Sequence, residues 1–356
     1  MLYNHFNGTV FKKYYMLENT AISKNKSIFI WLVTCVLLVF LMIFVGGLTR
    51  LTDSGLSITE WNPISGIIPP LSSRDWLKEF DLYKQTPEFV KINFNISLAE
   101  FKRIFLIEYF HRILGRITGA VFLLPFLYFL VNKQLIKSDI KYYCFIIISI
   151  MAQGVMGWLM VKSGLIDRPD VSHFRLAAHL GLAIFIMSLL LWKIFTFFKL
   201  ETVTNKKITV LACVNIVLVF CQIILGAFVA GLNAGMIYNQ FPLMGDGFVP
   251  YEFVYVKSFT DYFYDPAIIQ FFHRILAYLV LINIFILAIS SMRANLLKRT
   301  TLFLMIVVTL QVVLGVMTLL WQVPLVLASS HQLLAVILYS LSLFILNVCF
   351  KRSNSG

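Results

Sequence analysis

Charged residues are scarce in this chain. They make up only 13% of its 356 residues, while hydrophobic residues make up 59%. Soluble domains usually contain about 45–50% apolar residues and about 25% charged ones. This composition excludes an ordinary water-soluble enzyme and indicates a membrane protein.

Cysteine is also rare, with five residues that all fall inside predicted membrane spans, where a thiol behaves as a small apolar group: Cys35, Cys144, Cys213, Cys221 and Cys349. The predicted outer loops contain none, so we expect no disulfide. The N-terminus lacks a recognisable cleaved signal and an Arg/Ser-rich presequence. A bacterial inner membrane is therefore the simplest location.

Long apolar runs are what the chain does contain. A helix needs about 20 mainly apolar residues to cross a bilayer, and eight stretches meet this requirement: about 28–49, 107–131, 141–161, 174–198, 208–230, 268–291, 300–321 and 326–350. The sequence thus predicts an all-α membrane protein with eight transmembrane helices. An even number of spans places both termini on one side of the membrane.

The distribution of basic residues predicts which side this is. Sixteen of the 30 lysines and arginines, but only three of the 17 acidic residues, lie in the two terminal segments and the loops that follow the even-numbered spans. Basic loops stay in the cytoplasm, so residues 1–27 and the tail 351–356 are expected to be cytoplasmic. The net charge of +13 then faces anionic lipid headgroups and does not indicate nucleic-acid binding.

The chain repeats itself. EYFHRILGR at 108–116 returns as QFFHRILAY at 270–278, and MAQGVMGWLM in the third span resembles TLQVVLGVMTLL in the seventh. We therefore predict two four-helix bundles, residues 28–200 and 201–350, arranged as parallel repeats. A long first outer loop, 50–106, retains enough apolar residues to form a structured cap.

Four of the six histidines lie near the outer ends of alternate spans: His111, His179, His273 and His331. Polar side chains within a bilayer are costly and usually mark a site. Within each predicted bundle two imidazoles can converge from opposite sides. His5, in the N-terminal segment, and His173, in a loop without a counterpart, are expected to be solvated or interfacial.

Pairs of imidazoles favour haem over zinc, because a porphyrin needs only axial ligands whereas zinc takes three or four protein ligands. Each bundle is then expected to hold one porphyrin near the outer surface. Arg112 and Arg274 directly follow two of the histidines, and we expect them either to bind haem propionates or to extend towards the interface.

The two copies differ beside the first histidine. Glu108 shares a helix face with His111, whereas the corresponding residue of the second copy is the neutral Gln270. Glu108 is a candidate for holding or deprotonating water beside the porphyrin, and the alternative is an ion pair with Arg50 or Arg112. The difference suggests that only the first slot is reactive.

Together these segments resemble the haem A synthase family, in particular its mitochondrial and alphaproteobacterial branch. The most specific is GGLTRLTDSGLSITEWNPISGIIPP after the first span, accompanied by EYFHRILGR, RLAAHL, QFFHRILAY and SSHQLLA. The resemblance covers nearly the whole chain. Another branch of the family has a cysteine pair in the first outer loop, which this chain lacks.

The resemblance implies oxidation of a methyl group of haem O to a formyl group, giving haem A for cytochrome oxidase. It implies that His273 and His331 ligate a haem b, that His111 and His179 bind the substrate haem iron, and that Glu108 is needed for turnover. It also implies haem O synthase as a partner. We hypothesise two successive oxidations of one methyl group, with Glu108 activating water; the electron acceptor and homo-oligomer formation stay open.

Two other functions are compatible with paired histidines. A di-haem b-type electron-transfer protein would have two equivalent low-spin sites, and a haem transporter or chaperone would bind haem weakly in both halves. Neither needs a carboxylate in one half alone, so the difference between Glu108 and Gln270 favours the enzyme.

Overall fold

The structure is a computed structural model that describes residues 25–61, 65–165, 170–198 and 203–350. Its regular structure in these ranges is helical apart from one isolated bridge between Met244 and Gly247. The eight long helices are α3 (Lys26–Leu51), α6 (Leu98–Val131), α7 (Lys137–Gly164), α8 (His173–Phe195), α9 (Lys206–Gly231), α11 (Pro266–Arg293), α12 (Lys298–Leu320) and α13 (Leu325–Phe350). All eight are long and apolar enough to cross a membrane, as predicted.

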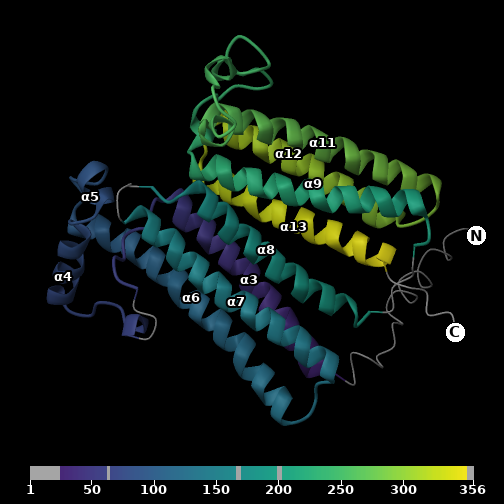
Figure 1. The fold of residues 1–356 in the computed structure, drawn as a ribbon, viewed down its shortest axis with the longest axis horizontal. Helices are drawn as coiled ribbons and strands as arrows, with labels where there is room; N and C mark the ends of the chain where they lie inside the picture. Colours follow the sequence, from purple (N-terminus) through teal and green to yellow (C-terminus); the bar gives the residue numbers. More distant parts are fainter. Residues whose placement is uncertain (1–24, 62–64, 166–169, 199–202, 351–356) are drawn as a thin grey trace, which may run out of the picture.

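The eight helices pack in two groups of four (Figure 1). In the first group α6 packs against α3 and α7, and α8 packs against the same two helices. In the second group α11 and α13 each pack against α9 and α12. Thus α6 lies diagonally opposite α8, and α11 lies diagonally opposite α13.

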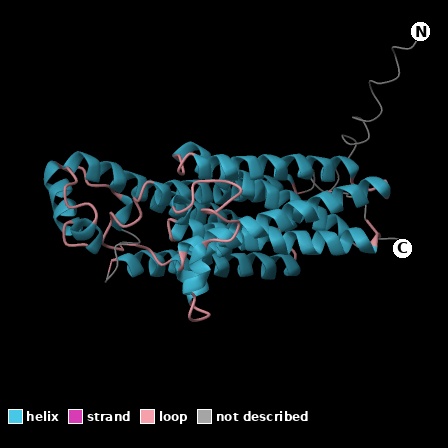
Figure 2. Ribbon diagram, turned by 90° about the horizontal axis from the view of Figure 1, so that it is seen from above, coloured by secondary structure: helices cyan, strands magenta, loops and turns pink. Residues whose placement is uncertain are grey.

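The turns between α6 and α7 and between α11 and α12 lie at one end of the molecule, and the cap lies at the other (Figure 1). Figure 2 shows the long helices running side by side along one direction, with loops gathered at the cap end. The N-terminal segment up to residue 24, which contains His5, and the tail 351–356 lie outside the described residues.

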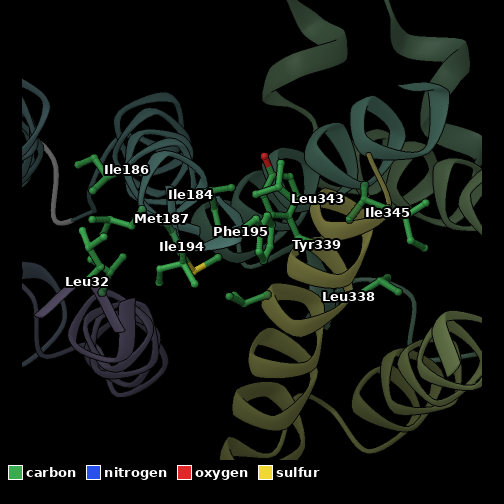
Figure 3. Packing of buried hydrophobic residues seen from close by; sticks show 14 of the residues in the cluster. Leu32, Ile184, Ile186, Met187, Ile194, Phe195, Leu338, Tyr339, Leu343 and Ile345 are labelled. Carbon is green, nitrogen blue, oxygen red and sulfur yellow. The ribbon is translucent and has the colours of Figure 1, made fainter. Parts of the chain in front are cut away.

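The interface between the groups is formed by α3 and α8 on one side and α9 and α13 on the other. Its core is a large apolar cluster in which Ile184 and Phe195 of α8 lie near Tyr339 and Leu343 of α13 (Figure 3). The hydroxyl of Tyr339 also lies 2.9 Å from the hydroxyl of Ser188. A polar contact of this kind fixes the register of two otherwise apolar helices.

The first outer loop forms a cap that contains a 3₁₀ turn at Ser65–Ile67 and two helices, α4 (Ser73–Tyr83) and α5 (Pro87–Lys91). The loop between α9 and α11 contains 3₁₀ turns at Ala234–Met236 and Tyr251–Tyr255 and the short helix α10 (Asp261–Tyr264). Phe80 and Tyr83 of α4 are buried against Phe101 and Phe105 of α6. This packing explains why the residues of the loop stay apolar although they lie outside the spans.

One helix begins earlier than the hydropathy predicts. The second span was expected from about residue 107, but α6 begins at Leu98, where Ser97 and Glu100 form a reciprocal capping box. At about 1.5 Å per residue its 34 residues are about 51 Å long, well beyond a hydrocarbon core of about 30 Å. The extra turns extend outward and carry the cap.

A polar contact between the two groups depends on a glycine. The side chain of Gln332, next to His331 on α13, donates a hydrogen bond of 2.8 Å to the carbonyl of Ile43 on α3. A Cβ at Gly47 would overlap Oε1 of Gln332. At the corresponding contact between α8 and α9, Leu180, next to His179, packs on a cluster that contains Ala227, the equivalent of Gly47. A glycine (Gly47) therefore lies beside a glutamine (Gln332) at one contact between the groups, and an alanine (Ala227) lies near a leucine (Leu180) at the equivalent contact.

We predict that Gly47→Ala displaces Gln332 and lowers the free energy of unfolding by about 1–3 kcal/mol, because a buried amide loses its partner. The double variant Gly47→Ala with Gln332→Leu reproduces the Ala227 and Leu180 pairing and should regain most of this loss. Thermal unfolding in detergent measures both. Equal stability of Gly47→Ala and the unaltered chain would contradict the steric argument.

Candidate functional site

The four predicted histidines all lie on the helices that face each other diagonally. His111 is on α6 and His179 on α8, while His273 is on α11 and His331 on α13. His179 is among the electrostatic neighbours of His111, and His331 is among those of His273. The structure thus brings the predicted residues together in two pairs, one in each group.

Each imidazole faces a glycine on the neighbouring odd-numbered span. A Cβ at Gly46 would lie 3.3 Å from Nε2 of His111, and one at Gly226 would lie 3.4 Å from Cε1 of His273. At Gly157 and Gly315 the corresponding distances to Cε1 of His179 and His331 are 3.1 and 2.8 Å. These glycines let the helix backbone pass beside an aromatic ring.

Glutamines on the same helices hold three of the histidines. The side-chain amides of Gln153, Gln222 and Gln311 each donate a 3.0 Å hydrogen bond to the backbone carbonyl of the facing histidine. Their amide nitrogens also lie 3.2–3.4 Å from ring nitrogens of the same residues. Gln153 and Gln311 stand at corresponding places of the sequence repeat, but the repeat does not reveal their contact with the histidines.

Glu108 is buried, with 2% of its surface exposed, and it is fully hydrogen-bonded. Its Oε1 accepts hydrogen bonds of 3.0 and 2.6 Å from the guanidinium of Arg112. Its Oε2 accepts one of 2.7 Å from the hydroxyl of Ser57 and one of 2.9 Å from the backbone N–H of Ile58. Of the two ion pairs considered for Glu108, the one with Arg112 is present. Arg50 instead donates hydrogen bonds to Ala230 and Asn233 of the second half.

Gln270 takes the same place in the second half. It is 3% exposed, accepts a 3.2 Å hydrogen bond from Arg274, and donates to the carbonyl of Ala234. The two arginines bind equivalent loop atoms, since Arg112 donates to the carbonyl of Ile58 and Arg274 to that of Tyr238, both at 2.9 Å. Each arginine therefore fastens the outer loop of its half to the helix that carries the histidine.

The two halves differ in the donors that remain. Both nitrogens of Arg112 nearest Glu108 are used by the carboxylate, whereas the Nε–H of Arg274 is buried and has no hydrogen-bond partner among the described residues. A buried guanidinium N–H without an acceptor is costly. Arg274 therefore has a donor available for an anionic group such as a propionate.

The prediction for His173 is wrong. We expected a solvated or interfacial side chain, but His173 is 7% exposed and begins α8. Its ring packs among Phe174, Phe228 and Tyr264. Aromatic residues from the second half thus cover it, which no local feature of the loop indicated.

The donor set fits porphyrin iron better than a bare metal ion. Among the described residues no group of three or more His, Cys, Asp or Glu side chains could hold a metal. The ring atoms Nδ1 of His179 and His331 are buried without a hydrogen-bond partner in the same part of the chain. Two imidazoles on diagonal helices, with Nδ1 of one ring in each pair unsatisfied, suit the axial positions of a haem.

Comparison with known proteins identifies the family of the chain. The profile of the COX15-CtaA family, described as cytochrome oxidase assembly protein, matches residues 29–343. The chain belongs to this family. It is 45% identical over 329 residues to heme A synthase of Ehrlichia canis, covering 91% of this chain and 93% of that one.

Two further relatives extend the match. Heme A synthase of Rickettsia bellii is 44% identical over 327 residues, with coverage of 89% and 96%, and that of Wolbachia pipientis wMel is 42% identical over 349 residues, with coverage of 96% and 97%. Eight apolar helices and bacterial relatives of full length make this a multi-pass protein of the bacterial inner membrane.

The cap contains a second buried carboxyl group. Glu88 of α5 is 4% exposed and accepts a 3.0 Å hydrogen bond from the hydroxyl of Tyr83, which in turn accepts one of 2.8 Å from Asn93. Burial raises the pKa of Glu88 from 4.5 to about 7, and the neighbouring negative charge of Glu108 adds to this effect. The folded cap therefore favours the protonated form.

We predict that the cap loses stability as the pH rises. Because the folded pKa of Glu88 lies above the unfolded one, its contribution is fully present below pH 4.5 and is lost as the pH rises through about 7. The loss is at most about 3 kcal/mol. Glu88→Gln keeps an acceptor for Tyr83 and should flatten the pH dependence of the unfolding temperature between pH 5 and 8. Parallel profiles for the two proteins would contradict this assignment.

Proposed function

We propose that this protein is a haem A synthase, an oxidoreductase that converts one methyl group of haem O to a formyl group and so provides haem A for cytochrome oxidase. The observation that carries the proposal is its identity of 41–45% with curated heme A synthases over most of the chain. Two pairs of histidines on diagonal helices of two groups support it from the structure.

The two halves have different tasks in this proposal. The first half, residues 28–200, binds haem O between His111 and His179, because it has the carboxylate of Glu108 where the second half has the neutral Gln270. The second half, residues 201–350, binds a haem b between His273 and His331, which would supply one-electron redox chemistry. Arg274 binds a propionate through its unpaired Nε–H, while Arg112 lies beside the substrate and fastens the loop.

Orientation follows from the basic residues. Both termini face the cytoplasm, and the cap with the outer ends of the helices faces the periplasm. Haem O is apolar and stays in the bilayer, so hand-over from haem O synthase within the membrane is the route that the chemistry favours. The cap and the outer loop then keep the substrate end of the site away from bulk water.

Glu108 is the proposed proton acceptor. Oxidation of a methyl group to a formyl group removes four electrons, and with water as the oxygen source four protons are released as well. All four acceptor positions of Glu108 are occupied in the structure. Transfer of a proton to Oε2 therefore requires Ser57 to turn away first, and Ser57 is the group that controls access to the carboxylate.

The function can be tested by extracting the porphyrins from cells that express the chain together with a source of haem O. Mass spectrometry should find the formyl product or its hydroxymethyl precursor. Haem O recovered unchanged, with no oxidised porphyrin, would reject the enzyme and leave the electron carrier or the transporter. A His111→Ala variant serves as the control, since the substrate pair is then incomplete.

We predict that Glu108→Gln lowers product formation about 10²- to 10⁴-fold, the usual contribution of a general acid or base. The variant should fold, because Gln270 already pairs with Arg274 in the same arrangement. It should also keep the haem bound by His273 and His331, as seen in its absorption spectrum.

The matched control for Glu108→Gln is Gln270→Glu, which places a carboxylate beside the other pair and should not replace the missing one. Undiminished product from Glu108→Gln would remove Glu108 from the mechanism. A loss of product accompanied by loss of the folded protein would indicate instead that Glu108 acts only by fastening the loop.

A further inference from the structure

One residue pattern recurs on three of the four odd-numbered spans. Gln153 and Gly157 on α7, Gln222 and Gly226 on α9, and Gln311 and Gly315 on α12 are each four residues apart. Residues at i and i+4 share a helix face, and in each case that face meets the histidine of the next helix. On α3 the same spacing joins Met42 and Gly46.

Each of the three glutamines has one end of its side chain occupied and the other free. The amide nitrogen donates to the backbone carbonyl of the histidine, which fixes the orientation of the amide, because the reverse orientation would oppose two carbonyl oxygens. The amide oxygens of Gln153, Gln222 and Gln311 are buried and have no partner among the described residues. A buried acceptor without a donor is unfavourable.

Two of the facing rings also contain a buried nitrogen without a hydrogen-bond partner in the described part of the chain. Nδ1 of His179 and Nδ1 of His331 are buried without partners in the same part of the chain. An imidazole that ligates a metal through Nε2 carries its proton on Nδ1, and this N–H almost always donates to a nearby oxygen. The amide oxygen of the adjacent glutamine also has no partner within the described ranges, while its amide nitrogen lies 3.4 Å from Nε2 of each of these rings.

We propose that Gln153, Gln222 and Gln311 are positioning residues that fix His179, His273 and His331 as haem ligands. The amide nitrogen of each glutamine holds the histidine backbone and lies beside the ring, and when iron takes its place at Nε2 the free amide oxygen is the acceptor for the Nδ1 proton. This grip sets the tautomer and the direction of the ring. The inference rests on the proposed function, because it takes the histidines to be haem ligands.

His111, the fourth histidine, is not held by a glutamine in this way. Met42 occupies the position of the glutamine, and its side chain lies against α6, with Cε 3.6 Å from where a Cβ of Gly115 would be. A thioether offers at most a weak acceptor and no N–H donor, so the hydrogen bond that Gln222 donates to the carbonyl of His273 has no counterpart at Met42. The first pair therefore contains one fixed and one unfixed imidazole, whereas both imidazoles of the second pair are fixed.

This difference matches what each pair has to do. A resident haem is retained when both ligands are held, and a haem that enters as substrate and leaves as product is exchanged when one ligand can turn aside. His111 is therefore the ligand that opens and closes the substrate site. Glu108 lies one turn before it on the same helix face.

The test uses the full chain in lipid nanodiscs loaded with iron protoporphyrin IX, with haem release to apomyoglobin as the measurement. In a His111→Ala background, where only the second pair binds haem through two histidines, Gln222→Met should release haem about 10- to 100-fold faster. Its midpoint potential should also rise, because an imidazole without the Nδ1 hydrogen bond is a weaker donor to ferric iron. Gln311→Leu should behave alike and provides a second variant if Gln222→Met does not fold.

The reciprocal variant is Met42→Gln in a His273→Ala background, which should slow haem release from the first pair. Ser342→Ala is the matched control, since it removes the buried 2.8 Å hydrogen bond from Asn215 in the second group without touching a histidine. It should leave release rate and potential unchanged.

Unchanged release and potential in both Gln222→Met and Gln311→Leu would overturn the proposal, even if the unaltered chain makes haem A. Release that depends on the glutamines, in a chain that makes no haem A, would uphold this inference and reject the proposed function. The two failures are thus distinguished by separate measurements.

Discussion

Close approach of a helix backbone to an imidazole is the constraint on which the two sites depend. A glycine on α3, α7, α9 or α12 lies beside each of the four histidines, and any side chain there would meet the ring at 2.8–3.4 Å. Between membrane helices, such small residues replace the hydrophobic effect as the basis of tight packing. The glycines therefore determine both the distance between helices and the place of the rings.

Duplication gives two sites with one geometry, and a few substitutions then give them different chemistry. Glu108 replaces Gln270, Met42 replaces Gln222, and the pair of Gly47 and Gln332 replaces Ala227 and Leu180. In each case the two members of the pair differ in polarity or charge while the helices pack in the same way. The first half has the charge of Glu108 and has Met42 where the second half has Gln222, and in the proposed function both differences favour turnover over retention.

The sequence predicted the eight spans, the cap and the four histidines, because hydropathy and repetition act over whole helices. It offered Arg112 as a possible ion-pair partner of Glu108, which is confirmed, but it did not predict the contacts of Glu108 with the outer loop. Ser57 and Ile58 lie about fifty positions away, and only the folded loop brings them to the carboxylate. His173 looked exposed for a similar reason, since the aromatic rings that bury it come from Phe228 and Tyr264 of the other half. The spacing shared by the three glutamines and their glycines was visible in the sequence, but its meaning required the facing rings.

The ion pair of Glu108 and Arg112 connects the chemistry with the outer loop. A buried pair is stabilised only while both charges are present, and removal of one leaves the other unsatisfied. Arg112 also donates to the carbonyls of Ile58 and Glu60, so the guanidinium holds the loop and the carboxylate together. A proton accepted by Glu108 removes one charge of the pair and weakens the hold on Arg112. In the proposed mechanism, protonation of Glu108 and the attachment of the outer loop are therefore linked by the same two side chains, whereas Gln270 of the second half carries no charge.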